Sequence, residues 1–142
     1  AKAIEADAAA LADASRMVLD AAIDAIRPGR RWSEVAIVMQ TIAEQAGYGV
    51  VRDFLGHGIG RSLHEQPPAP AFATDDFRLR HDFVLQSGLV LAVEPMLTLG
   101  SPQVRTLDDG WTVVTVDGRP ACHVEHTIAV STHGAEVLTD RA

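Results

Sequence analysis

The first third of the chain carries hydrophobic positions at helical spacing. Over residues 1–26 apolar side chains recur three, four and seven positions apart, which predicts a helix with one apolar face. Pro28-Gly29 ends it, because proline cannot continue a helix and glycine suits the turn. A second helix is predicted from an N-cap at Ser33 to about Ala46. The stripe of the first helix is formed by Ile4, Leu11, Val18, Leu19, Ala22, Ile23 and Ile26.

After residue 49 the pattern changes to that of strands and loops. Residues 50–55, 89–93, 111–116 and 124–131 have the β-branched and apolar character of strands. The Gly-His-Gly-Ile-Gly segment at 56–60 predicts a sharp turn, and residues 66–70, with three prolines, predict an irregular extended connection. Residues 74–86 are expected to form an exposed loop. Helices followed by a mainly antiparallel β-rich part indicate an α+β fold in one domain, residues 1–142.

Composition and charge narrow the functional class. The chain has 142 residues, 47% of them hydrophobic, which is a globular composition. Nineteen acidic residues against twelve basic ones give a net charge of −7, which argues against nucleic acid or an anionic membrane as a partner. The single cysteine excludes an internal disulfide and fits a reducing compartment, so a cytoplasmic protein is expected.

Three positions suggest a metal site. His57 lies between two glycines, Glu94 ends an apolar strand, and Glu125 lies inside another. Each alone has a simpler explanation, namely a turn histidine, an exposed strand end or a solvent-facing strand position. Together, one imidazole and two carboxylates form a plausible ligand set for Mn, Fe, Co or Zn. A second histidine, His64, could then donate a hydrogen bond to a polarised carbonyl.

Strand alternation and the lack of other catalytic motifs refine this hypothesis. Period-two alternation puts Glu125, Thr127 and Ala129 on one face of their strand, with Val124, His126 and Ile128 on the other. Competing chemistries have less support. Cys122 has no feature that lowers a thiol pKa, there is no Gly-x-Ser-x-Gly elbow, and the glycines at 56, 58 and 60 do not match a dinucleotide fingerprint.

Four segments resemble a known family. They read GHGIGRSLHEQP at 56–67, VEPM at 93–96, DGWTVVT at 109–115 and EHTI at 125–128. In this order and with these gaps they resemble the motifs of bacterial-type methionine aminopeptidases. The resemblance implies the pita-bread fold, of which this chain resembles the second, C-terminal half. It also implies a cytoplasmic hydrolase of protein maturation, a protease that removes the N-terminal methionine of nascent polypeptides through metal-activated water.

The resemblance carries residue roles with it. As metal ligands for divalent ions (Co, Mn, Fe or Zn, two in the complete site) it implies His57, Glu94 and Glu125. As catalytic groups it implies Glu94 and His64. As residues that bind the substrate and its methionine side chain it implies His64, Trp111 and Leu63, the last standing where the family usually has phenylalanine.

The departures from the family pattern raise an alternative. Two aspartates and another histidine of the family site belong to the first half, so three of five metal ligands are expected here. The fragment is therefore expected to be incomplete or inactive alone and to need a separate or missing N-terminal half. A half-fold also exposes the face that meets its other half, which favours self-association. The alternative is a non-catalytic module that retains the pocket to bind a peptide or protein.

Overall fold

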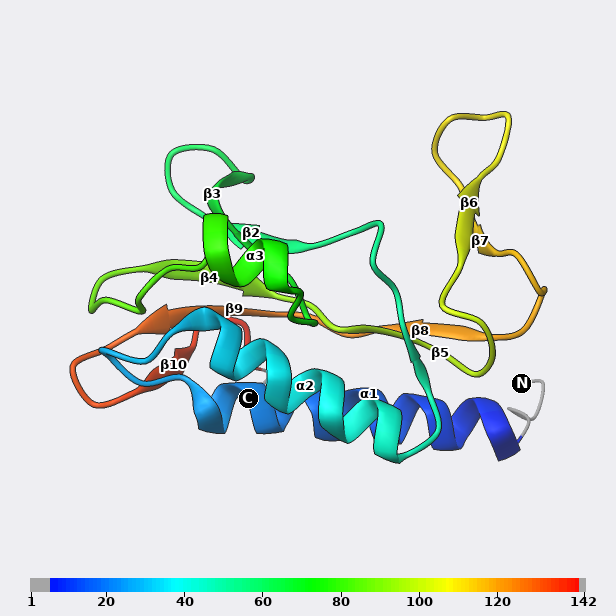
Figure 1. Ribbon diagram of the computed structural model, residues 1–142, viewed down its shortest axis with the longest axis horizontal. Coiled ribbons are helices and arrows are strands. Elements are labelled where there is room, and N and C mark those ends of the chain that lie inside the picture. The colour runs from blue at the N-terminus through cyan, green and yellow to red at the C-terminus, as the bar shows by residue number, and fades with distance from the viewer. Residues whose placement is uncertain (1–5, 141–142) are drawn as a thin grey trace.

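The chain folds as two long helices packed beneath antiparallel strands. The computed structural model describes residues 6–140. Helices α1 (Ala6–Ala25) and α2 (Trp32–Gln45) lie side by side along one face of the strands, and the short α3 (Asp75–Arg80) follows later (Figure 1). This arrangement confirms the α+β prediction. The strands are β1 (Gly49–Val50), β2 (Gly56–Gly58), β3 (Glu65–Ala69), β4 (Val90–Val93), β5 (Met96–Thr98), β6 (Val104–Thr106), β7 (Val113–Thr115), β8 (Ala121–His123), β9 (His126–Val130) and β10 (Ala135–Val137).

The described strands form three sheets in which every pairing is antiparallel. The largest has the order β10-β9-β4-β2-β3, a second has the order β1-β5-β8, and β6 with β7 forms a hairpin that projects away from the rest (Figure 1). β4 runs on into β5, and β8 runs on into β9, so the first two sheets share these two chain segments. Val93 pairs with His126 on one side of the junction and Met96 with His123 on the other.

The hydrophobic core lies between the helices and one face of these strands. Leu91, Val93 and Leu97 are fully buried, as is Ile128 on β9. The helices contribute Leu11, Val18 and Leu19 from α1, and Trp32, Val35 and Met39 from α2. Ile4 of the predicted stripe lies outside the described residues. Within residues 6–140 there is no helix with the length and apolar character needed to cross a bilayer.

The predicted N-cap at Ser33 is wrong. Helix α2 begins at Trp32, and the backbone N–H of Arg31 donates to the Glu34 carboxylate at 2.9 Å. Ser33 lies inside the first turn, where its N–H and hydroxyl both donate to Asp82, at 2.9 and 2.8 Å. The acceptor for the helix start therefore comes from a residue 49 positions away, which local sequence spacing does not reveal.

Two of the predicted irregular segments are strands. Gly56–Gly58 is β2, not a sharp turn, and it lies between β3 and β4. A Cβ at Gly56 would collide with the carbonyl oxygens of Ala92 and Ala69, so glycine here permits close approach of neighbouring strands. The proline-rich 66–70 segment is mostly β3, which tolerates prolines because it is the edge strand of its sheet.

Other boundaries also differ from the prediction. The expected exposed loop at 74–86 contains α3, whose N-cap Thr74 accepts a hydrogen bond from the N–H of Phe77 at 3.1 Å. The strand expected at 50–55 is reduced to Gly49–Val50, and that at 111–116 to Val113–Thr115. Before the second of these strands the chain forms a turn instead, in which the Asp109 carboxylate accepts from the N–H groups of Trp111 and Thr112.

Candidate metal centre

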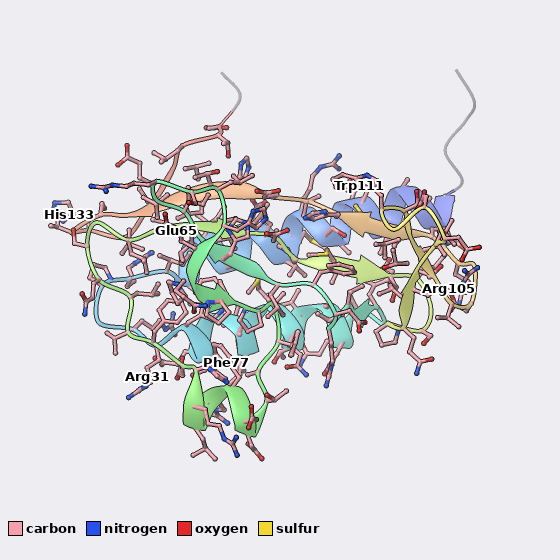
Figure 2. The ribbon with its side chains drawn as sticks, turned by 90° about the horizontal axis from the view of Figure 1, so that it is seen from above. Arg31, Glu65, Phe77, Arg105, Trp111 and His133 are labelled. Atoms are coloured by element: carbon pink, nitrogen blue, oxygen red, sulfur yellow. The ribbon has the colours of Figure 1, made fainter. Side chains whose placement is uncertain are left out.

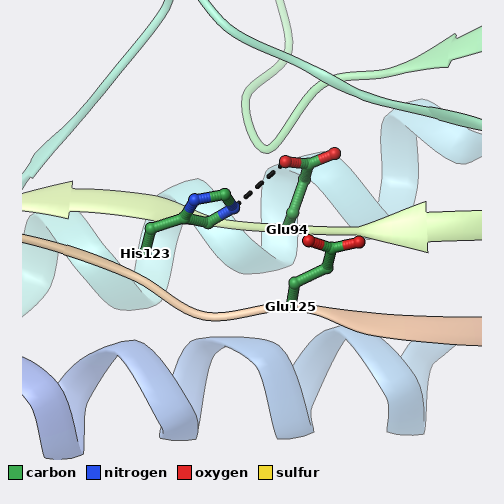
Figure 3. Close-up of side chains that lie close together, drawn as sticks. All are labelled: Glu94, His123 and Glu125. Atoms are coloured by element: carbon green, nitrogen blue, oxygen red, sulfur yellow. Dashed lines mark hydrogen bonds and ion pairs between the residues drawn. The ribbon is translucent and has the colours of Figure 1, made fainter. Parts of the chain in front are cut away.

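Glu94 and Glu125 lie opposite each other where two strand ladders are interrupted. Glu94 follows the last residue of β4, and Glu125 precedes the first residue of β9. The pairings on either side of the gap keep the same register, which makes these two residues cross-strand neighbours. Directly opposed residues of an antiparallel pair point to the same face. His123, two residues before Glu125, shares that face, so the backbone brings three donor side chains together (Figure 3).

The side chains meet around the Glu94 carboxylate. Glu94 Oε2 lies 3.0 Å from His123 Nε2, and Glu94 Oε1 lies 3.5 Å from His57 Nε2. One donor atom from each of Glu94, His123 and Glu125 lies within 4.8 Å of the other two (Figure 3). The Glu94 side chain is only 10% exposed, whereas that of His123 is 49% exposed. Glu94 is thus a nearly buried carboxylate with one imidazole on each oxygen.

The electrostatics of this cluster favour a cation. The hydrogen bond that the His123 ring donates to the Glu94 carboxylate raises the pKa of His123, partial burial of the ring opposes this, and the charges of Glu94 and Glu125 add to it. Two carboxylates facing each other across a ladder repel when no positive charge lies between them. A protonated His123 or a bound divalent cation would each relieve that repulsion.

His57 is held so that one ring nitrogen faces the cluster. It lies on β2 opposite Ala92, and its Nδ1 is 2.9 Å from the carbonyl oxygen of Gly58. Since a carbonyl only accepts, Nδ1 carries the proton, and in the neutral ring Nε2 has a free lone pair toward Glu94. The ring of His64 lies 4.0 Å from that of His57, centroid to centroid, at a tilt of 38°.

A cleft of about 510 Å³ opens beside the cluster. His57, His64, Glu94 and His123 form part of its wall. The rest is largely apolar: Val51, Phe54, Leu55, Met96, Val104, Val113, Val114, Thr115, Ala121 and Cys122. A mainly apolar cleft with a few convergent polar groups is typical of a small-ligand site.

The residues predicted from sequence lie in different places. His57, His64 and Glu94 line the cleft, and Glu125 lies beside Glu94. Trp111 is 88% exposed on the β6–β7 hairpin, and Leu63 is 68% exposed; neither belongs to the cleft wall. Figure 2 shows Trp111 at the end of the molecule that carries Arg105, away from Glu65 and His133.

Sequence reasoning did not single out His123 or the apolar residues Phe54, Leu55 and Met96. A signal for His123 was available. In an extended strand, residues two apart point to the same face, so the His-x-Glu spacing of His123 and Glu125 already places an imidazole beside a carboxylate. For the apolar wall there was no such signal, because its members come from five separated segments.

The donor set fits a divalent metal. Imidazole nitrogen and carboxylate oxygen are the ligands preferred by borderline ions such as Zn, Mn, Fe and Co. Glu94 is nearly buried, and its two oxygens already point at separate nitrogen donors. An imidazole that donates its other nitrogen to a backbone carbonyl, as His57 does, is the usual arrangement of a metal-binding histidine.

Comparison with known proteins gives a consistent result. Residues 2–132 match metallopeptidase family M24. The chain is 48% identical over 109 residues to a methionine aminopeptidase of Clostridium perfringens, covering 77% of this chain and 42% of that protein. It is 45% identical over 113 residues to methionine aminopeptidase 1 of Bacillus subtilis, covering 80% of this chain and 44% of that protein.

Solved structures show the same similarity in three dimensions. The methionine aminopeptidase of Thermotoga maritima superposes with a TM-score of 0.89 at 42% identity, covering 96% of this chain and 53% of that one. A prolidase of Pyrococcus furiosus, at 22% identity and a TM-score of 0.67, shares the fold. The chain therefore spans about half the length of the relatives that it matches.

Proposed function

The chain belongs to metallopeptidase family M24, and we propose that it supplies the metal-binding half of an aminopeptidase that removes the N-terminal methionine of nascent polypeptides. The observation that carries this proposal is the Glu94 carboxylate, nearly buried beside an apolar cleft, with Glu125 next to it and an imidazole on each of its oxygens. The similarity to bacterial methionine aminopeptidases supports the choice of substrate.

Membership of the family implies a divalent metal, and we propose His57, Glu94 and Glu125 as its ligands. The position of His57 Nε2, 3.5 Å from Glu94 Oε1, and the closeness of Glu94 to Glu125 support this set. Cobalt, manganese, iron and zinc all suit these donors. When bound, such an ion would polarise the scissile carbonyl and lower the pKa of a water molecule.

The side chains of this chain would then orient the substrate and move the proton. Glu94 is proposed as the carboxylate that accepts a proton from the attacking water and returns it to the leaving amine, since it is the least exposed carboxylate of the cluster. His64, whose ring contacts that of His57 at the cleft wall, is proposed to donate a hydrogen bond to the substrate carbonyl oxygen.

The cleft suits a methionine side chain. Phe54, Leu55, Met96 and Val113 offer an apolar wall next to the histidines, and Met96 can adapt its shape to a flexible thioether. Trp111 and Leu63 remain predicted substrate contacts. Because both are highly exposed in the chain described here, a contact with substrate would require the β6–β7 hairpin and the loop after β2 to close over the cleft.

Activity of the chain is proposed to depend on a second, N-terminal half. The chain spans 42% of the Clostridium perfringens relative. The resemblance to the family implies two further carboxylate ligands, which this chain does not contain. A partner half in the cytoplasm, separate or covalently linked, would complete the ligand set. The competing arrangement is self-association of the chain through the face that would otherwise meet the N-terminal half.

Release of methionine from a Met-Ala-Ser peptide tests the function. The chain is assayed with Co²⁺ or Mn²⁺, alone and mixed with the half of a bacterial relative that it does not cover. We expect release by the mixture, lost on Glu94→Gln and retained with Glu136→Gln, a control carboxylate exposed on β10. A mixture that forms a complex but releases no methionine would refute the proposal. Retention of peptide binding by His57→Ala in that case would favour the non-catalytic module.

A further inference from the structure

We propose that His123 is a metal ligand, so that His123, Glu94 and Glu125 hold one divalent cation without any residue from outside this chain. This inference extends the proposed function, since it concerns the same metal. It adds a nitrogen donor that the sequence motifs do not include. It also assigns the Oε2 side of Glu94 to a cation, whereas His57 lies near Oε1.

The backbone fixes all three donors. His123 is the last residue of β8 and pairs with Met96 of β5, while Glu125 lies two residues further on. Glu94 lies two residues before Met96 on the facing segment. Each donor is therefore attached to one of two paired strands, and alternation points all three to the same face. The pairing of the two strands thus brings the three donor side chains together, and no loop has to move to do so.

The separations suit a single ion. Donor atoms of the three residues lie within 4.8 Å of one another, and His123 Nε2 lies 3.0 Å from Glu94 Oε2. Zinc binds imidazole nitrogen at about 2.0–2.1 Å and carboxylate oxygen at about 2.0–2.2 Å, so its ligands lie roughly 3–4 Å from one another. Small rotations of exposed side chains close the remaining gap.

The two imidazoles face different oxygens of Glu94. His57 Nε2 lies near Oε1, and His123 Nε2 lies near Oε2. An ion beside Oε2 and Glu125 thus has His123 as its neighbouring nitrogen donor. His57 lies at the opposite oxygen of the same carboxylate. His123 is therefore not a substitute for His57 but a ligand on the second side of the same carboxylate.

Charge and access support the assignment. Glu94 and Glu125 bring two negative charges together, and a divalent cation with a neutral imidazole balances them. His123 is 49% exposed and lines the cleft, so an ion can reach it from solvent without opening the fold. The face of the strands that carries the core remains covered by α1 and α2 throughout.

Isothermal titration of the 142-residue chain with Mn²⁺ and Co²⁺ tests the proposal. His123→Gln keeps a side chain able to hydrogen-bond Glu94 but removes the imidazole, and we expect metal affinity to fall about tenfold or more. His126→Gln is the matched control, because His126 points to the other face and its Nδ1 lies 2.8 Å from the Thr139 hydroxyl. We expect its affinity to stay within about twofold of wild type.

A second measurement avoids substitution altogether. Nitrogen chemical shifts of the histidine rings, followed during titration of the unmodified chain with Zn²⁺, should show Nε2 of His123 becoming metal-bound. Unchanged affinity in His123→Gln, or His123 shifts that do not respond, would overturn the inference. If His57→Gln abolishes binding while His123→Gln does not, the proposed function keeps its metal and only the role of His123 fails. Failure of the wild-type chain to bind at millimolar metal also overturns the inference, whereas the peptidase assay with the added half decides the function separately.

Discussion

Replacing Glu125 by glutamine should change stability in opposite directions with and without metal. In the metal-free chain Glu125 faces Glu94 across the interrupted ladder, and removing one of two like charges should stabilise the fold. In the metal-bound chain the same change removes a ligand. The variant therefore distinguishes two roles of Glu125: binding a cation, or only stabilising the paired strands.

The size of each effect follows from the distance and from binding linkage. The donor atoms lie within 4.8 Å of one another, and at that outer limit two unit charges repel by roughly 0.9 kcal/mol at the dielectric constant of water and about 3.5 kcal/mol at an effective value of 20. Glu125 is exposed, so screening favours the lower figure, and we expect a gain of about 0.5–1 kcal/mol. Metal at 100 times its dissociation constant stabilises a folded chain by about 2.7 kcal/mol, most of which the variant should lose.

Urea unfolding at pH 9, which disfavours the imidazolium form of His123, measures both effects. The free energy of unfolding is compared for wild type and Glu125→Gln, once with EDTA and once with saturating Mn²⁺. The helical circular dichroism signal, which comes mainly from α1 and α2, reports the unfolding transition. Glu136→Gln provides the control on an exposed strand position. A variant that is less stable than wild type by the same amount in both solutions would refute the reasoning, because Glu125 would then act through structure and not through charge.

Three further predictions concern stability. Because Glu94 raises the pKa of His123, the stabilisation of the fold by this pair should be fully present below the pKa of an unfolded histidine, about 6.5. It should be lost as the pH rises through the pKa of His123 in the folded chain. Metal-free urea unfolding of wild type and His123→Gln from pH 5 to 9 measures this loss. Leu97→Ala, at a fully buried site on β5, should cost about 2–5 kcal/mol in the same assay, and an equal cost for exposed Leu138→Ala would contradict this. Asp82→Ala should cost about 1–3 kcal/mol and fray the start of α2, seen as faster amide exchange at Ser33, since it removes the buried acceptor.

The sequence predicts the helical part of this fold well and the strand part less well. The apolar stripe at helical spacing identifies α1, because helix packing against a sheet needs only one continuous apolar face. β2 was missed as a strand, since Gly56 and Gly58 have low strand propensity. Their place in the sheet depends on β3 and β4 approaching too closely for a side chain, which is a long-range property.

The site shows the same division between local and distant information. Residue type and motif similarity single out His57, Glu94 and Glu125, whose placement the structure now describes. The position of Glu94 opposite Glu125 depends on the register of two segments about thirty residues apart, which no local pattern encodes. His123 was missed as a possible ligand for a different reason, since it can bind a metal together with Glu94 only because the fold places the two side chains next to each other.

The interruption of both ladders explains why this position suits a metal. Pro95 offers no backbone N–H, so the regular ladder stops beside Glu94, although the N–H of Val124 still donates to the carbonyl oxygen of Pro95 at 3.5 Å. Paired strands resume on both sides in unchanged register, held from behind by Leu91, Leu97 and Ile128 against the helices. The carboxylates are thus placed by rigid neighbours while their own segment can adjust. Such a fold can hold two opposed carboxylates in one chain, and a cation bound between them removes their repulsion and stabilises the folded state.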